Sequence, residues 1–230
     1  MPARPIAPLW RGVAEGLPFV VILAPFGALF GVLATEAGLP LAQVMGFTML
    51  VIAGASQFVA IQLMADGVPA AIVVLSALAV NLRMVMYSAA MVPHLGAAPF
   101  WQRATIAYML VDQTYALAQT TYDREQTWSV PEKVAYFAGT ALPVFPVWVG
   151  STWVGAVLGA QMPDTWELDF ALPLAFLALI GPMLKSRAHV AAAFVSVAGT
   201  LLLWWIPWNL GLIVAAIAAM AVGAEMERRS

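Results

Sequence analysis

Two charged residues, Arg83 and Asp112, each interrupt a long apolar stretch of the 230-residue chain. Arg83 lies within the run 69–92, and Asp112 lies within the run 101–121. A charged side chain at bilayer depth costs about 2.5 kcal/mol or more, so it is normally retained only inside a protein or along a polar pathway. The two residues therefore indicate a path for a solute or a proton rather than a passive membrane anchor.

The two charges are predicted to reach similar depths. A rise of about 1.5 Å per helical residue places Arg83 roughly 14 Å and Asp112 roughly 16 Å from the outer ends of consecutive, antiparallel helices. We expect either a structural ion pair or a switchable one. In the switchable form a substrate carboxylate competes for the guanidinium, whose planar fork suits carboxylates, and Asp112 carries a proton.

Other polar side chains recur at helical spacing around these charges. Arg83 and Tyr87 share one helix face and Asn81 lies on another, so this helix is expected to be surrounded by protein. The step Gly54-Ala55-Ser56-Gln57 predicts either an unwound segment that coordinates substrate or a close glycine packing surface. In the run 101–121 and just after it, a polar stripe on one helix face predicts a cavity lining or a polar interface: Thr105, Tyr108, Asp112, Tyr115, Gln119 and Tyr122.

The composition identifies the class of protein that positions these residues. The chain is 63% hydrophobic and 10% charged, whereas soluble domains have roughly 45–50% and 25%. It is therefore predicted to be a polytopic helical membrane protein. A net charge of −2 offers no basic surface for nucleic acid, and the chain contains no cysteine. No P-loop motif for ATP hydrolysis occurs. We expect no cofactor, no metal and no enzymatic activity, since His94 lacks a catalytic constellation.

Apolar length predicts an all-α bundle of about eight transmembrane helices, in one transmembrane transport domain that covers residues 1–230. The final hydrophobic stretch could form one helix instead of two, which would give seven. Five prolines in or near the spans predict kinked or broken helices: Pro18, Pro25, Pro143, Pro146 and Pro173. The predicted helices are 17–35, 41–65, 68–92, 101–121, 133–160, 170–184, 188–206 and 208–224.

Lysine and arginine are distributed unequally between the predicted loops. With the N-terminus in the cytoplasm, eight of these residues fall inside and only Arg103 falls outside, so both termini are predicted to be cytoplasmic. Pro18 and the glycines of 27–31 recur at a constant offset as Pro146 and the glycines of 155–159. The recurrence indicates either a 4+4 parallel internal repeat or ordinary glycine packing surfaces.

Four segments resemble one known family. They are Ala-Gly-Ala-Ser-Gln-Phe at 53–58, Val-Asn-Leu-Arg at 80–83 with 87–95, Asp-Gln-Thr-Tyr-Ala-Leu at 112–117, and Leu-Asp-Phe-Ala-Leu-Pro at 168–173. Over roughly 16–211 the chain is similar to the AzlC-type large subunit of branched-chain amino acid exporters. Relatives often carry Asp-Glu-Thr where this chain has Asp-Gln-Thr at 112–114, which leaves Asp112 as the only carboxylate of that motif.

The resemblance implies an export permease subunit of the bacterial cytoplasmic (inner) membrane. It would move branched-chain or other small hydrophobic amino acids outward by proton antiport, together with a small AzlD-type membrane subunit. Arg83 would meet the substrate carboxylate, Ser56, Gln57 and Asn81 would bind polar groups, and Asp112 would carry the proton. Tyr87, Tyr108 and Tyr115 would line the path. The alternatives are a transporter subunit for another amino acid such as methionine, or a non-transporting scaffold or sensor subunit.

Overall fold

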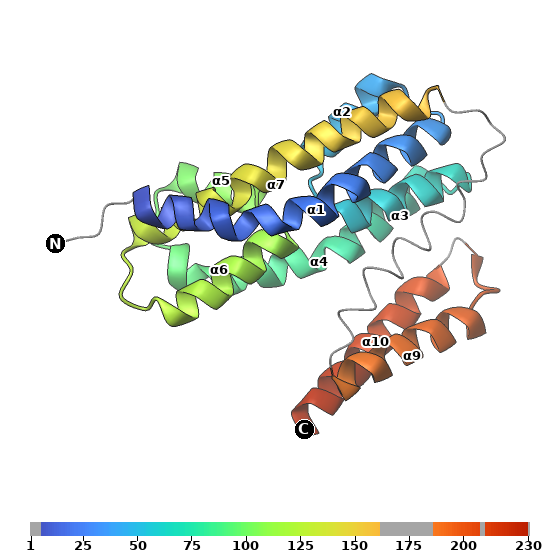
Figure 1. Cartoon of the computed structure of the whole chain (residues 1–230). Helices are drawn as coiled ribbons and strands as arrows, with labels where there is room; N and C mark the ends of the chain where they lie inside the picture. The colour runs from blue at the N-terminus through green and yellow to red at the C-terminus, as the bar shows by residue number, and fades with distance from the viewer. Residues whose placement is uncertain (1–5, 162–185, 208–209, 230) are drawn as a thin grey trace.

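The computed structural model describes residues 6–161, 186–207 and 210–229, and these residues form helices and turns with no strand among them. The predicted all-α fold is confirmed for this part of the chain (Figure 1). Four of the helices are long and apolar enough to cross a bilayer, namely α1, α4, α7 and α10. The helices are α1 (Ile6–Glu36), α2 (Leu41–Leu50), α3 (Gly54–Ala65), α4 (Ala70–Leu95), α5 (Phe100–Tyr108), α6 (Asp112–Arg124), α7 (Val130–Gly159), α9 (Arg187–Leu202) and α10 (Leu210–Arg229).

Most predicted boundaries agree with these helices to within a few residues. The exception is the first helix, which begins eleven residues before the predicted start at position 17. The extra turns contain the charged residues Arg11 and Glu15, which lie before the predicted start. A turn at 203–206 separates α9 from α10, so the final stretch forms two helices. The predicted helix 170–184 lies outside the described residues, and the count of eight spans therefore stays a prediction.

Two predicted helices are each divided in the middle, so their continuity in the prediction was wrong. The predicted helix 41–65 stops after α2 and resumes as α3, and the helix 101–121 stops after α5 and resumes as α6. Residues 51–53 and 109–111 are as apolar as their neighbours, so hydropathy gave no signal of either break. The predicted polar stripe is consequently split: Thr105 and Tyr108 belong to α5, and the other four side chains belong to α6.

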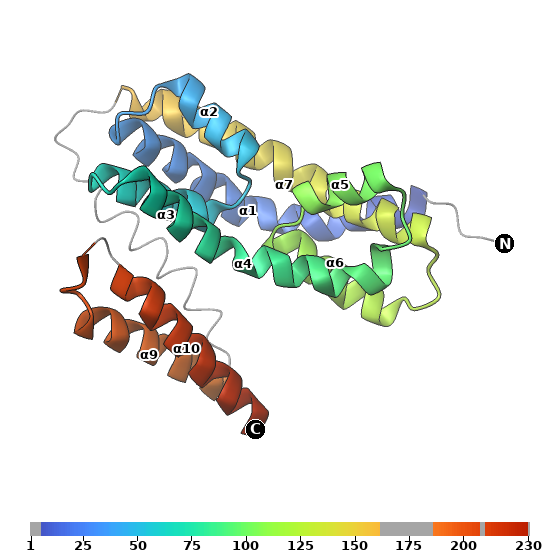
Figure 2. The same cartoon turned by 180° about the vertical axis from the view of Figure 1, so that it is seen from behind.

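Proline does not cause these breaks, contrary to the prediction. Pro18 and Pro25 lie inside the continuous α1, and Pro143 and Pro146 lie inside the continuous α7. Neither break contains a proline. Transmembrane helices tolerate proline where neighbouring helices and side chains satisfy the freed backbone groups, and α1 and α7 pack against each other along their lengths (Figure 2).

Small residues bring α1 and α7 together in a parallel pair. Gly155 approaches Ala28 and Gly159 approaches Val32, so residue numbers rise in the same direction along both helices. A Cβ atom at Gly155 would overlap the backbone of Ala28, which explains why only glycine fits there. The recurring glycine motifs are therefore packing surfaces that face each other, as the second interpretation predicted. The internal repeat is not confirmed.

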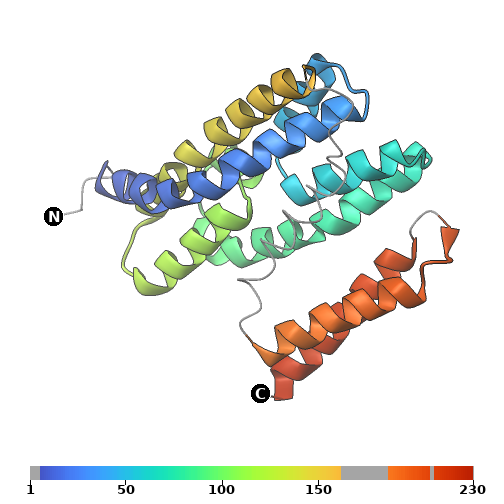
Figure 3. The same ribbon diagram turned by 45° about the vertical axis from the view of Figure 1, so that its right-hand side comes forward.

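Helices α2 to α6 pack on this pair or on one another, and α9 and α10 pack on each other. Helix α2 and helix α6 pack on α7, whereas α3 packs mainly on α4. An apolar cluster at one end of the bundle includes Phe30, Phe58 and Trp148, which are almost fully buried. Helices α9 and α10 form an antiparallel hairpin, in which Gly199 packs on Ala215. Figure 3 shows this hairpin (orange to red) beside α3 and α4.

Candidate functional site

Arg83 and Asp112, the two charges predicted to lie within the membrane, form an ion pair, which both sequence-based interpretations require. Nη1 of Arg83 on α4 lies 3.0 Å from Oδ2 of Asp112 on α6. The hydroxyl of Tyr87 donates a hydrogen bond of 2.9 Å to the other carboxylate oxygen, Oδ1. Both oxygens of Asp112 thus have a donor. The i, i+4 spacing of Arg83 and Tyr87 places both donors on the side of α4 that meets α6.

Two features of α6 stabilise this arrangement. Asp112 is the first residue of the helix, where the partial positive charge of the helix dipole favours a carboxylate. Tyr115 lies one turn later, and its ring stacks on that of Tyr87 with centroids 4.1 Å apart and planes at 10°. The stacked rings hold the Tyr87 hydroxyl in place. The structure therefore brings four of the eight predicted site residues together: Arg83, Tyr87, Asp112 and Tyr115.

The pair is not sealed inside the bundle. The side chain of Arg83 is 30% exposed and that of Asp112 is 43% exposed, so each is only partly covered by the described helices. Arg83 also retains a spare donor, because its Nε is buried and has no hydrogen-bond partner among the described residues. Asn81, on the same helix, likewise has a buried Oδ1 without a described partner. A donor and an acceptor without hydrogen-bond partners are what a ligand-binding site needs.

Side chains from the start of α3 cap the first break. The hydroxyl of Ser56 donates to the Ala53 carbonyl at 2.9 Å, and the Ala53 N–H donates to Oε1 of Gln57 at 3.3 Å. Ser56 and Gln57 are fully buried. Of the two interpretations of 54–57, the structure supports close glycine packing, because Gly54 lies in α3 against Trp148 and Phe26. The break lies at 51–53, directly before these residues. Both polar side chains thus stabilise the break from within the helix.

A single threonine caps the second break. The hydroxyl oxygen of Thr114 accepts a hydrogen bond of 3.0 Å from the Val111 N–H. It also lies 3.0 Å from the carbonyl oxygens of Met109 and Val111, to one of which it donates. Thr114 is fully buried. The sequence analysis did not select it, although a buried threonine two residues after a charged helix start is a usable signal for a side-chain cap.

A hydrogen bond links the two breaks to each other. The hydroxyl of Tyr108, the last residue of α5, donates to the backbone carbonyl of Met49 near the end of α2. Val111 and Ile52, one from each break, also pack against the same apolar cluster. Tyr108 therefore does not lie with the charged pair, as the predicted stripe required, but connects the two interrupted spans. The helices α3 and α6 both begin beside this junction.

A second polar network was missed by the sequence analysis. Arg11 contacts the carboxylates of Glu15 at 2.8 Å and Glu125 at 2.7 Å. The hydroxyl of Tyr136 donates to Glu15, and Thr121 donates to the Tyr136 hydroxyl at 2.9 Å. The network ties α1, α6 and α7 together at one end of the bundle. Arg11 and Glu15 stand four residues apart, which was the available signal for an ion pair on one helix face.

His94 contributes to a helix interface. Its Nδ1 lies 3.3 Å from Nζ of Lys133, and its ring lies 5.2 Å from the ring of Tyr122. Tyr122 in turn donates to the Lys133 carbonyl at 2.7 Å. These contacts join α4, α6 and α7. The sequence offered no catalytic constellation around His94 and favoured a helix-cap or interface role, and these contacts place it in an interface.

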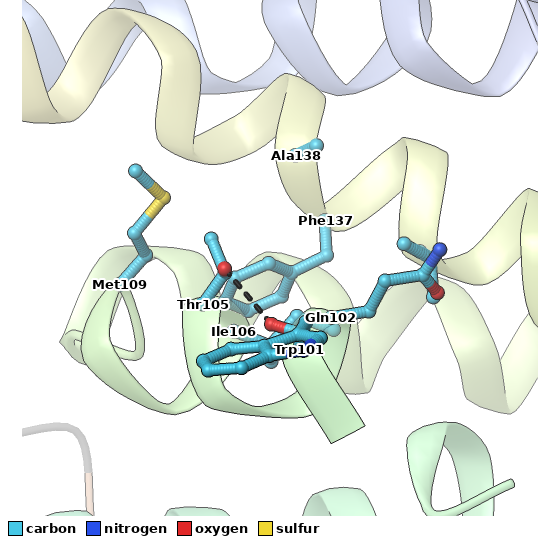
Figure 4. Close-up of a pocket in the computed structure, with 8 residues that line it drawn as sticks. Trp101, Gln102, Thr105, Ile106, Met109, Phe137 and Ala138 are labelled. Carbon is cyan, nitrogen blue, oxygen red and sulfur yellow. Dashed lines mark hydrogen bonds between the residues drawn. The ribbon is translucent and has the colours of Figure 1, made fainter. Parts of the chain in front are cut away.

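A shallow apolar pocket lies between α5 and α7, apart from the charged pair (Figure 4). Its lining includes the hydrophobic side chains of Trp101, Ile106 and Phe137. The hydroxyl of Thr105 donates back to the Trp101 carbonyl at 2.9 Å, so it offers no free proton to a ligand. The pocket contains none of the eight predicted site residues, and we assign it no role.

Comparison with known proteins agrees with the resemblance. The family model described as AzlC protein matches residues 18–162. The inner membrane protein YgaZ of Escherichia coli K12 is 27% identical over 241 residues, which cover 98% of this chain and 97% of that protein. Uncharacterized membrane proteins of Archaeoglobus fulgidus and Helicobacter pylori 26695 are 29% and 26% identical, covering 80% and 86% of this chain and 78% and 79% of their own. No solved structure matches. With its four apolar helices and these relatives, the chain is a membrane protein that belongs to the AzlC family.

Proposed function

We propose that this chain is the export permease subunit for branched-chain or other small hydrophobic amino acids and works by proton antiport. The observation that carries the proposal is the partly exposed Arg83–Asp112 pair between α4 and α6, with Tyr87 on its second carboxylate oxygen. Ionisable groups at this depth typically mark substrate or proton pathways. The family assignment supports a transport subunit rather than an enzyme.

The pair couples proton and substrate through competition for Asp112. When Asp112 is charged, it can hold the ammonium group of an amino acid whose carboxylate binds Arg83. When Asp112 takes up a proton, it loses the charge that holds this ammonium group, so the proton displaces the substrate. Proton and substrate are then bound in turn, as antiport requires. Tyr87 can still donate to the neutral acid, so Asp112 stays in position.

The polar residues around the breaks would complete the path. Ser56, Gln57 and Asn81 would bind the polar groups of the substrate, and Tyr115 and Tyr108 would form its walls. Discontinuous helices commonly build such sites in transporters because their ends present unpaired backbone groups near the bilayer midplane. We further propose that both termini lie in the cytoplasm and that a small AzlD-type membrane subunit assembles with this chain. These assignments follow the charge distribution and the family resemblance.

Transport into inverted vesicles tests the proposal. The chain is co-expressed with its small partner subunit, the vesicle lumen is acidified, and uptake of labelled leucine, valine and methionine is measured. We expect uptake that an uncoupler abolishes and that Asp112→Asn abolishes. Asp123→Asn is the matched control, because Asp123 lies on the same helix but is exposed and bound to Gln119. Proton-dependent uptake by the Asp112→Asn variant would refute the coupling role.

The scaffold alternative makes the opposite prediction for a double variant. If Arg83 and Asp112 only lock the bundle, neutral replacement of both should preserve function, since no unpaired charge remains. A transporter that uses the two charges should lose transport in Arg83→Gln/Asp112→Asn even when the protein folds normally. Arg83→Lys tests the geometry separately, because lysine keeps the charge but not the planar fork. Unchanged substrate affinity in Arg83→Lys would contradict bidentate binding.

A further inference from the structure

We propose a second binding site for the carboxylate of the transported amino acid, at the N-terminal end of α3. The site consists of the first-turn N–H groups of α3, Nε2 of Gln57 and Nε1 of Trp148, and we call this set the donor cluster. The inference rests on the proposed function and extends it. The donor cluster would bind the substrate carboxylate in the state in which Arg83 is still bound to Asp112.

The orientation of Gln57 is determined by its neighbour. The Ala53 N–H donates to Oε1 at 3.3 Å, and rotating the amide would bring two donors together, so Nε2 must be the free end. That nitrogen is buried and has no hydrogen-bond partner among the described residues. Because Ala53 is the residue that precedes α3, the free donor lies at the start of this helix.

Trp148 on α7 reaches the same place from the other side. Its ring edge would lie 3.0 Å, at Cη2, and 3.5 Å, at Cζ2, from a Cβ atom built on Gly54, the first residue of α3. Trp148 is 4% exposed. Its indole Nε1, on the same ring edge, is buried and also has no partner in the described part of the chain. Gly54 is thus needed for the close approach of this ring.

These groups share one chemical character. An indole nitrogen and an amide nitrogen can only donate, and the first N–H groups of a helix lack intrahelical acceptors. The helix dipole adds partial positive charge at the same end. Two unpaired side-chain donors lie at or beside the start of α3, and an oxygen anion is the group that such donors would bind. Carboxylate is the one anionic group that the proposed substrates carry.

The surroundings suit the rest of a hydrophobic amino acid. Phe26 and Phe58 pack with ring centroids 4.7 Å apart, and Phe30 stacks on Trp148 at 6.4 Å. These rings form an apolar wall beside the donor cluster. The donor cluster includes neither Arg83 nor Asp112, which are bound to each other. A carboxylate can therefore be bound there while the ion pair remains closed, and its apolar side chain can contact the aromatic rings.

Ligand binding to the purified full-length chain, assembled with its small partner, tests this site. Titration calorimetry would compare leucine, 4-methylpentanoate, which lacks the amine, and leucinamide, which lacks the carboxylate. We expect the first two to bind and leucinamide to bind at least tenfold more weakly. Gln57→Glu keeps the acceptor for the Ala53 N–H and replaces the free donor by an anion. It should weaken both carboxylate ligands at least tenfold.

Matched variants separate the site from general damage. Gln62→Glu makes the same change at an exposed position of α3 and should bind normally. Trp148→Phe removes the indole donor and should weaken binding severalfold, whereas Trp153→Phe on the exposed side of α7 should not. Melting temperatures would confirm that each variant is folded. Wild-type affinity for 4-methylpentanoate in both Gln57→Glu and Trp148→Phe would overturn the inference and would mean that the donors hold only water.

The outcomes distinguish this inference from the proposed function. Normal leucine transport with unaltered binding in the Gln57→Glu variant would refute the donor cluster and leave the exporter intact. Carboxylate binding that depends on Gln57, without transport of any amino acid, would support the site and refute the exporter. A wild-type complex that binds neither leucine nor 4-methylpentanoate would refute both.

Discussion

Gly155→Ala should destabilise the parallel contact between α1 and α7. A methyl carbon at this position would lie 2.7 Å from Cα of Ala28 and closer still to its carbonyl oxygen. Since carbon atoms pack at roughly 3.5–4.0 Å, the two helices must separate by about 1 Å. Overpacking of this kind costs about 1–3 kcal/mol. For a chain of this size it corresponds to a loss of roughly 2–12 °C in melting temperature.

Gly150→Ala on the same helix is the control for this substitution. A Cβ atom there meets no atom within 4 Å. Both variants gain the same helix propensity, about 0.5–1 kcal/mol, so their difference isolates the helix contact. Melting would be followed by circular dichroism in one detergent for both proteins. Equal melting temperatures for Gly155→Ala and Gly150→Ala would refute the close approach on which the fold depends.

Three further predictions concern the polar contacts. A double-mutant cycle on Arg83→Gln and Asp112→Asn should give a coupling of about 1–2 kcal/mol in the free energy of unfolding. This is below the roughly 3–5 kcal/mol lost when a fully buried pair is broken, because both side chains are partly exposed. Thr114→Val should cost about 1–3 kcal/mol by leaving the Val111 backbone unsatisfied, whereas Thr114→Ser should be nearly neutral in the same melts. Glu125→Gln should change stability by less than about 1 kcal/mol, since its pair with Arg11 is partly exposed, and a loss of several kcal/mol would contradict this.

The sequence predicted the charged pair because the prediction needs only the depth of each charge and the order of the two helices along the chain. Two charges on adjacent antiparallel helices at equal depth have few other ways to be compensated in a membrane. The i, i+4 spacing of Arg83 and Tyr87 also gave the position of the tyrosine correctly. What the sequence lacked was the tertiary contact of Tyr87 with the carboxylate of Asp112, since hydropathy and helical periodicity describe one helix at a time.

The breaks show where sequence reasoning failed. Both are apolar and free of proline, and each is stabilised by a side chain inside the following helix: Gln57 in one case and Thr114 in the other. A search for apolar length passes through such a segment without a signal. The prolines predicted breaks that do not occur, because packing of α1 on α7 keeps those helices continuous. The network around Glu15 was overlooked because the first helix was predicted to start after it.

The parallel packing of α1 on α7 has a consequence for biosynthesis. Ala28 and Gly155 touch although they are 127 positions apart in the chain. At a synthesis rate of about 5–20 residues per second, roughly 6–25 s pass after Ala28 is made before Gly155 exists. During that interval the small-residue surface of α1 has no partner in the nascent protein. Insertion of the first helix and completion of its packing are thus separate events, and the intervening helices must enter the membrane without closing the place that α7 will take.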